Sequence, residues 1–159
     1  VSYRLGKKGT FMSAMVLATI LSIFFYFIDG SNVILIFAMQ FFISLCAGIT
    51  FPLIWSMYAD SSDYSEWKTK RRATGLIFSA SSMSQKFGWT LGGALAGWLL
   101  GYYGFEANVI QTETTQNGIR MMLSFFPAIG TFFGALFMFF YPLNEKKMKE
   151  ISSDLQQTR

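Results

Sequence analysis

Four long apolar stretches, separated by short polar segments, set the pattern of this chain. They cover about residues 11–28, 33–58, 73–103 and 119–141; the first ends at DGSN and the last at YPLN, both turn-forming sequences. About 20 mostly apolar helical residues cross the hydrocarbon core of a bilayer. Because an isolated strand could not satisfy its backbone in lipid, the pattern predicts an all-α membrane protein with four transmembrane helices.

Positive charge occurs in every second connection between these stretches. Lys and Arg precede the first stretch, fill 59–72 and follow the fourth, whereas 29–32 and 104–118 contain neither. The positive-inside rule therefore predicts cytoplasmic positions for 1–10, for a charged loop at 59–72 and for a tail at 142–159, with an external loop at 104–118. Apolar Leu143, Met148, Ile151 and Leu155 fit either an amphipathic helix or a solvated tail.

The composition of the 159 residues supports a membrane protein and argues against two other classes. Hydrophobic residues make up 52% and charged residues only 14%, against about a quarter in soluble domains. The net charge is +4, but the basic residues segregate by membrane side, so no nucleic-acid partner is expected. Without a histidine, a nucleophile elbow or a metal-ligand cluster, we expect no enzyme, no bound metal and no cofactor in the usual sense.

Lys86 stands near the middle of the third stretch. It lies about 13 residues from the start of that span, or roughly 20 Å along a helix, which is close to the membrane midplane. A central lysine costs about 2.5 to 3.5 kcal/mol on insertion scales, so a polar cavity or a partner is expected. The helical stripe that contains it is small and polar: Gly75, Ser79, Ser82, Lys86, Gly93 and Gly97, with Thr90 at the edge. The pattern favours a solute or ion pathway; the alternatives are a buried carboxylate partner or a side chain that stretches to an interface.

Glycines recur at helical spacing in the same span. Small residues four apart allow helices to approach closely in lipid, so these positions are predicted to serve helix packing. They are Gly88, Gly92, Gly93, Gly97 and Gly101.

Acids and then bases occupy the connection that follows the second span. Asp60, Asp63 and Glu66 are three apart and share one face if the segment is helical. The basic residues that follow are Lys68, Lys70, Arg71 and Arg72. Such a network could lock one conformation at a cytoplasmic mouth, while an ordinary solvated loop would explain the bases but not the regular acids.

The segment ADSSDYSEWKTKRRATG resembles the loop signature of the glycoside–pentoside–hexuronide:cation symporters, a branch of the major facilitator superfamily. That signature is roughly an Asp, two residues, Asp-Tyr, an acid and an Arg a few positions later. The matching residues are Asp60, Asp63, Tyr64, Glu66 and Arg71 or Arg72. Lys86 falls where the family places a lysine in the next span, and YPLNEKKMKEI is similar to the family's tail. Lys70 stands where Gly is more usual.

The resemblance covers nearly the whole chain and implies a mechanism. It implies the last four of twelve spans of a carrier that imports a sugar or glycoside with a coupling cation, Na⁺ or H⁺, by alternating access. The substrate-binding residues implied are Lys86, with Ser82 as its hydroxyl neighbour, and Phe51 and Trp55 as aromatic faces for a sugar ring; the alternative for these two aromatics is contact with lipid or with the protein core. The cytoplasmic gate consists of the matching loop residues. The cation would bind mainly to the N-terminal helices, which are missing here and are the expected partners together with substrate and membrane lipid. The location implied is the bacterial inner membrane, with both ends cytoplasmic.

Two other interpretations remain open from the sequence. One is a carrier of the same fold for lysolipid or another amphiphile. The other is a self-contained four-span structural membrane subunit. Because the chain begins with Val1 and not with Met, we expect a fragment of a longer protein.

Overall fold

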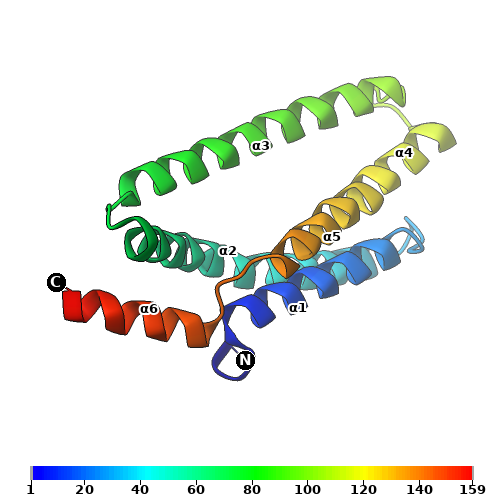
Figure 1. The fold of residues 1–159 in the computed structure, drawn as a ribbon. Coiled ribbons are helices and arrows are strands. Elements are labelled where there is room, and N and C mark those ends of the chain that lie inside the picture. Colours follow the sequence, from blue (N-terminus) through cyan, green and yellow to red (C-terminus); the bar gives the residue numbers. More distant parts are fainter. Residues whose placement is uncertain (1, 159) are drawn as a thin grey trace.

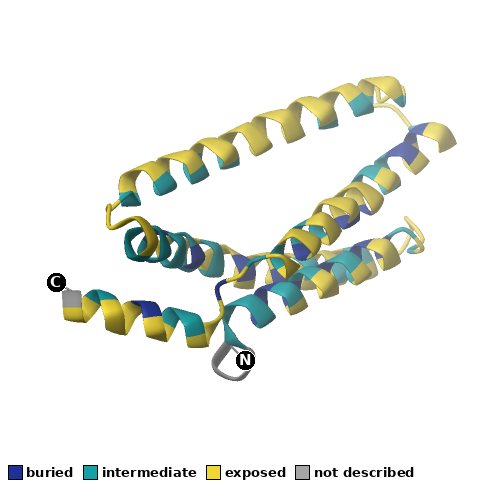
Figure 2. Ribbon diagram, viewed as in Figure 1, coloured by how far each residue is buried: buried dark blue, intermediate teal, exposed yellow. Residues whose placement is uncertain are grey.

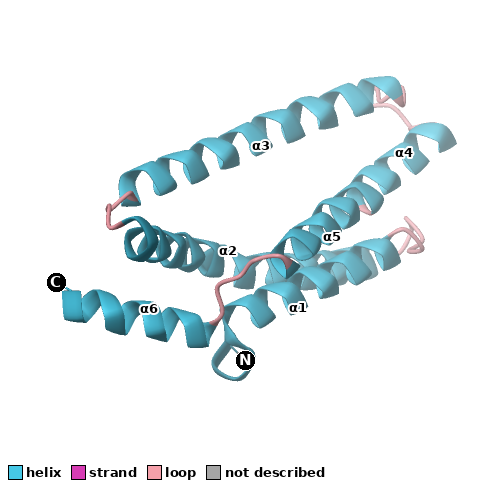
Figure 3. Cartoon of the chain, in the orientation of Figure 1, coloured by secondary structure: helices cyan, strands magenta, loops and turns pink. Residues whose placement is uncertain are grey.

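The computed structural model describes residues 2–158, and within them the backbone forms helices and loops without a strand (Figure 3). The helices are α1 (Ser2–Phe25), α2 (Val33–Thr69), α3 (Thr74–Tyr102), α4 (Glu113–Leu123), α5 (Phe125–Phe139) and α6 (Glu145–Thr158). The all-α class predicted from the sequence is confirmed.

Helix α1 lies between α2 and α5, and these three helices form the packed part of the molecule (Figure 1). The contact between α1 and α5 includes a hydroxyl pair, with Thr19 Oγ1 and Thr131 Oγ1 2.8 Å apart. Small buried side chains on the two helices permit this close approach. They are Ala14 and Ala18 on α1 and Ala128 and Ala135 on α5.

Most large apolar side chains lie on the outside of this helix arrangement (Figure 2). Phe37 and Phe137, for example, are 70% and 71% exposed, which would be costly in water but is favourable in lipid. Within residues 2–158, three stretches are long and apolar enough to cross a membrane: Gly6–Phe25, Val33–Thr69 and Glu113–Phe139. The structure therefore has the character of a multi-pass membrane protein.

Helix α3 differs from these three stretches. It has 29 residues, enough to span a membrane. Its many glycine and serine residues and its two tryptophans lower its mean hydropathy, so it is not among the three stretches named above. None of the residues of α3 is buried. Figure 1 shows α3 standing apart from the other helices along most of its length, and joined to them at its two ends.

The charged segment at 59–72 was expected to be a loop. In the structure α2 continues through it as far as Thr69. The spacing of the acids supports this extension, and α6 packs against it. The helix ends at Lys70, whose φ of 56° is left-handed and whose N–H donates to the carbonyl of Glu66 at 2.8 Å. Left-handed backbone favours glycine, which explains why Gly is more usual in the sequence pattern at this position.

The single span expected at 119–141 is built from two helices and starts earlier. Helix α4 begins at Glu113, where the hydroxyl of Thr112 caps it by accepting from the N–H of Thr115 at 3.3 Å. The helix breaks at Ser124, whose hydroxyl donates to the carbonyl of Arg120 at 2.5 Å. Pro127 in the first turn of α5 has no N–H for the preceding turn, which favours a break at this point.

The tail adopts the helical alternative. Asn144 Oδ1 accepts from the N–H of Lys147 at 2.9 Å and caps the start of α6. Ile151 is only 1% exposed, and α6 packs on the extended end of α2. The apolar positions of the tail therefore face a partner helix within the chain.

Candidate functional site

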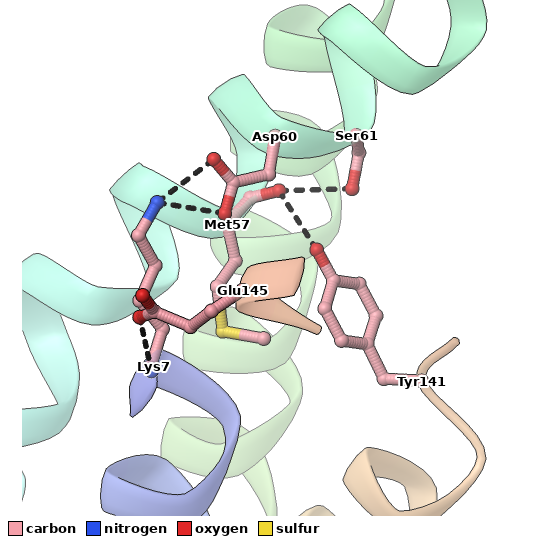
Figure 4. A network of polar contacts seen from close by, with 6 residues as sticks. All are labelled: Lys7, Met57, Asp60, Ser61, Tyr141 and Glu145. Atoms are coloured by element: carbon pink, nitrogen blue, oxygen red, sulfur yellow. Dashed lines mark hydrogen bonds and ion pairs between the residues drawn. The ribbon is translucent and has the colours of Figure 1, made fainter. Parts of the chain in front are cut away.

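A polar junction forms where the first turns of α1, the segment that follows α5 and the middle of α2 come together. We use this name for Lys7, Asp60, Ser61, Tyr141 and Glu145, grouped around the carbonyl of Met57 (Figure 4). The Lys7 ammonium lies 2.8 Å from both carboxylate oxygens of Asp60, whose side chain is only 14% exposed. The N–H of Lys7 also donates to Glu145 Oε1 at 3.2 Å. The pair thus ties α1 to α2, and Lys7 also reaches the start of α6.

The Met57 carbonyl accepts two further hydrogen bonds in the junction. Ser61 Oγ donates to it at 2.9 Å, and the Tyr141 hydroxyl donates to it at 3.4 Å (Figure 4). Tyr141 lies two residues beyond the end of α5. Burial raises the pKa of its phenol, and the nearby negative charge of Asp60 acts in the same direction. The phenol therefore stays protonated as a donor.

A glycine allows the chain to enter this junction. Gly6 has φ 70° and ψ 169°, a non-helical backbone conformation inside α1 that residues other than glycine rarely adopt. A Cβ at this position would also approach Glu145 Cγ at 3.0 Å. The kink directs the N–H of Lys7 toward Glu145.

The other gate residues lie further along the extended end of α2, in separate contacts. Glu66 Oε2 and Arg72 Nε are 4.0 Å apart. The Tyr64 ring stacks on Trp67 at 6.2 Å, with the Lys147 ammonium 5.6 Å from its centroid. Asp63 lines a pocket that also includes Lys7, Asp60 and Tyr141 of the polar junction. Arg71 is exposed. The structure thus brings Asp60, Asp63, Tyr64 and Glu66 onto one helix.

Several residues that the sequence patterns did not select complete this end of the molecule. Trp67 Nε1 donates to Asp154 Oδ2 at 2.9 Å and links α2 to α6. The Lys8 ammonium donates to the carbonyls of Phe139 and Tyr141 at 2.9 and 2.7 Å, where it satisfies the open C-terminal end of α5. Both contacts join residues far apart in sequence, so no local pattern could have revealed them.

At the opposite end of the helices, Asp29 and Arg120 approach each other. Asp29 Oδ1 and Arg120 Nη2 are 3.9 Å apart, and the carboxylate is exposed. The hydroxyl and the N–H of Ser31 hold the pKa of the Asp29 carboxyl below its usual range, and the charge of Arg120 contributes less. The contact links the α1–α2 turn to α4.

Lys86 and its stripe lie on the part of α3 that stands apart. Lys86 is exposed, and its carbonyl accepts from the hydroxyl of Thr90 at 2.9 Å. Ser82, one turn earlier, is half-buried. A Cβ added at any of the five predicted packing glycines would meet nothing within 4 Å: Gly88, Gly92, Gly93, Gly97 and Gly101. Any packing partner of this face would therefore be a helix outside residues 2–158.

The two aromatic candidates, Phe51 and Trp55, lie where α2 meets the start of α3. Trp55 is 37% exposed, and its ring stacks on Phe78 of α3 at 6.0 Å, with an interplanar angle of 26°. Phe51 is 51% exposed and meets Trp55 edge-on at 6.5 Å. Ser62 and Thr74 hydroxyls, 2.6 Å apart, fix the same helix pair. Trp55 therefore has a structural partner, whereas much of Phe51 is open.

Among residues 2–158, no group of three or more His, Cys, Asp or Glu side chains could hold a metal ion. The helices and the polar junction define an α-helical membrane protein whose helices are tied together at one end by charged side chains. A family model described as MFS/sugar transport protein matches residues 1–145. The chain belongs to this family of transport proteins, which also agrees with the expectation that it is not an enzyme.

Individual relatives give the same family. The chain is 30% identical over 156 residues to the glucuronide carrier protein homolog of Escherichia coli (strain K12), covering 98% of this chain and 34% of the relative. It is 36% identical over 157 residues to the isoprimeverose transporter of Lactiplantibacillus pentosus, covering 97% and 32%. The inner membrane symporter YicJ of E. coli is 30% identical over 153 residues, covering 95% and 33%.

The chain therefore spans about a third of the length of these curated relatives. No solved structure is significantly similar to it. The resemblance noted from the charged segment and from Lys86 is confirmed at the level of the family.

Proposed function

We propose that the chain is the C-terminal third of a secondary active transporter that imports a sugar or glycoside with a coupling cation. The observation that carries this proposal is the match to the sugar transport family over residues 1–145, together with relatives named as a glucuronide carrier homolog, an isoprimeverose transporter and a symporter. In this proposal α1, α2, α3 and the α4–α5 pair are the last four of twelve spans.

The proposed location is the bacterial inner membrane, with both ends of the chain in the cytoplasm. The supporting observation is the distribution of basic residues, since Lys7 and Lys8, the end of α2 and the start of α6 all lie at one end of the helices. The opposite end carries the Asp29–Arg120 contact. On this orientation the polar junction is cytoplasmic.

The open face of α3 is proposed to line the transport pathway. Lys86 is exposed there without a carboxylate partner among the described residues, and a lysine at midplane depth requires water, a solute or a charged partner. The substrate would be held by Lys86 and Ser82 as polar groups, with Phe51 and Trp55 as aromatic faces. The coupling cation, Na⁺ or H⁺, would bind mainly to the preceding helices of the carrier.

The cytoplasmic charges are proposed to stabilise one state of alternating access. Asp60 already has a partner within the chain. Asp63, Tyr64 and Glu66 lie along the end of α2 that projects beyond the bundle, and Arg71 and Arg72 follow directly after its last residue. Contacts from this end to the other half of the carrier would close the cytoplasmic side.

The test is cation-dependent uptake of labelled glycosides by the full carrier, comparing the wild type with Lys86→Ala and with Lys68→Ala as the matched lysine control. Surface expression is equalised by quantitative labelling. We expect at least about a tenfold loss for Lys86→Ala, which corresponds to about 1.4 kcal/mol, and little change for Lys68→Ala. Wild-type uptake that does not depend on Na⁺ or H⁺ would refute symport, and normal uptake by Lys86→Ala would remove Lys86 from the pathway.

A further inference from the structure

A pocket of about 640 Å³ opens beside the polar junction, where α1, α2, the segment that follows α5 and α6 meet. The chain brings residues from four separate segments to it. Four members of the polar junction line it: Lys7, Asp60, Tyr141 and Glu145. The lining also includes Lys8, Asp63, Leu143, Lys146, Met148 and Lys149.

The pocket lies at the depth of the lipid head groups. Gly6 begins the first membrane-competent stretch and Phe139 ends the last one, and the pocket is lined by residues at both of these boundaries. Met57 lies about 24 residues beyond Val33 in α2, or roughly 36 Å along the axis, slightly more than a hydrocarbon core of about 30 Å. All three helices therefore place this pocket at the membrane–water interface.

The pocket combines an apolar floor with an ammonium rim. Met57 and Leu143 are each 5% exposed and contribute apolar surface, together with Met148. Lys146 and Lys149 are exposed at the rim, and the Lys8 ammonium lies at the C-terminal end of α5. This order matches that of a phospholipid, whose glycerol and acyl carbons would lie against the apolar floor and whose phosphate would lie at the rim.

The charge balance of the pocket favours an anion. Lys7 is neutralised by Asp60 at 2.8 Å. Three ammonium groups, on Lys8, Lys146 and Lys149, then face two carboxylates, on Asp63 and Glu145. The Glu145 carboxylate is already engaged, because it accepts a hydrogen bond from the N–H of Lys7 at 3.2 Å. One net positive charge remains toward the rim.

We propose that this pocket binds the phosphodiester head group of an anionic phospholipid, with phosphatidylglycerol as the probe. Basic pockets between membrane helices on the cytoplasmic side bind such head groups, and the apolar floor accommodates the glycerol backbone. A bound lipid would bridge the ends of α1 and α5 to the start of α6. The inference depends on membrane insertion but not on which solute is carried.

The experiment is native mass spectrometry of the detergent-purified carrier with added phosphatidylglycerol or phosphatidylcholine. Lys146→Gln/Lys149→Gln is compared with Lys68→Gln/Lys70→Gln, which removes the same charge from the same end of the molecule outside the pocket. Each lysine near an anionic lipid surface changes the binding affinity by about fivefold. We therefore expect about a twenty-five-fold loss of phosphatidylglycerol affinity for Lys146→Gln/Lys149→Gln, and no such loss for the control pair. Equal losses in the two pairs would overturn a specific site.

Two further arms separate the sources of the phosphate. Glycerol 1-phosphate at the same concentration should not compete with phosphatidylglycerol, because it lacks the acyl carbons that meet Met57 and Leu143. Full competition by glycerol 1-phosphate would show that the pocket binds a soluble anion, and it would overturn the lipid proposal. Ser152→Asp, which adds a negative charge to the lining, should also weaken retention; unchanged retention would place the lipid elsewhere. Neither readout requires transport, so failure here is distinct from failure of the proposed function.

Discussion

The ring of Tyr103 lies directly against the backbone of Gly118, so closely that a Cβ on Gly118 would approach three ring carbons at 2.3 to 2.6 Å. Beside this contact, the buried hydroxyl of Thr115 donates to the carbonyl of Tyr103 at 2.7 Å. The end of α3 is therefore fastened to α4 by both a ring and a hydrogen bond. This attachment keeps a helix that lacks other contacts along its middle in a defined position.

Replacing Gly118 by alanine should displace Tyr103 and loosen this attachment. We expect a loss of about 1 to 3 kcal/mol in the free energy of unfolding, the usual range for overpacking a tight contact. Thermal unfolding of the detergent-purified carrier measures it. Gly130→Ala is the matched control, because a Cβ there meets nothing within 4 Å. Equal effects of the two substitutions would show that the ring contact is unimportant.

Removing the charge of Asp60 should destabilise the junction through its partner. Asp60→Asn leaves the Lys7 ammonium, 35% exposed, without its counter-ion. Because both groups keep some solvent contact, we expect a loss of only about 1 to 2 kcal/mol in unfolding free energy. A double-mutant cycle with Lys7→Gln isolates the pair, and Glu106→Gln on the exposed opposite loop is the control. A coupling energy near zero would contradict the structural role assigned to the pair.

The left-handed conformation of Lys70 leads to a prediction with opposite signs at neighbouring positions. Lys70→Gly should stabilise the protein by about 0.5 to 1 kcal/mol, because glycine adopts φ 56° without the steric penalty of a side chain. Lys68→Gly, two residues earlier and still inside α2, should destabilise it by about 1 kcal/mol. Chemical or thermal unfolding of both variants measures the difference. Destabilisation by Lys70→Gly would refute the end of α2 at this residue.

The buried phenol of Tyr141 predicts a loss of stability at alkaline pH. Its pKa is raised in the folded state, so its stabilising contribution is complete below the unfolded pKa of about 10 and is lost as pH rises through the folded value. Tyr141→Phe should remove this part of the alkaline loss. Unfolding is followed against pH for both proteins, with Tyr102→Phe, 73% exposed, as the control. Parallel curves for wild type and Tyr141→Phe would disprove the prediction.

The sequence was sufficient for the helical class and for most helix positions, because the apolar stretches are long and their ends carry turn residues. It was insufficient for the break at Ser124 and for the continuation of α2 to Thr69. Both depend on tertiary or hydroxyl–backbone contacts: Ser124 donates to the carbonyl of Arg120, and α6 packs on the end of α2. Charge density alone cannot distinguish a solvated loop from a helix that has a partner.

The candidate site could be predicted only in part from the sequence. Asp60 could be selected from the acid spacing, but its partner Lys7 lies 53 positions away and belongs to no shared motif. Lys86 could be selected because a charge in an apolar span is conspicuous by itself. Its surroundings could not be derived, since the open face of α3 offers no contact within the described residues.

Helix α2 has 37 residues, or about 55 Å of continuous rod, which is far longer than a hydrocarbon core of about 30 Å. A rigid helix of this length converts a small rotation at one end into a large displacement at the other. In the proposed membrane arrangement, the Asp60–Lys7 pair lies near the point where α2 leaves the bilayer. Trp67 and Tyr64 hold α6 on the part of α2 beyond that point. A small tilt of α2 within the membrane would therefore sweep this part and its attached helix through a much larger arc outside it.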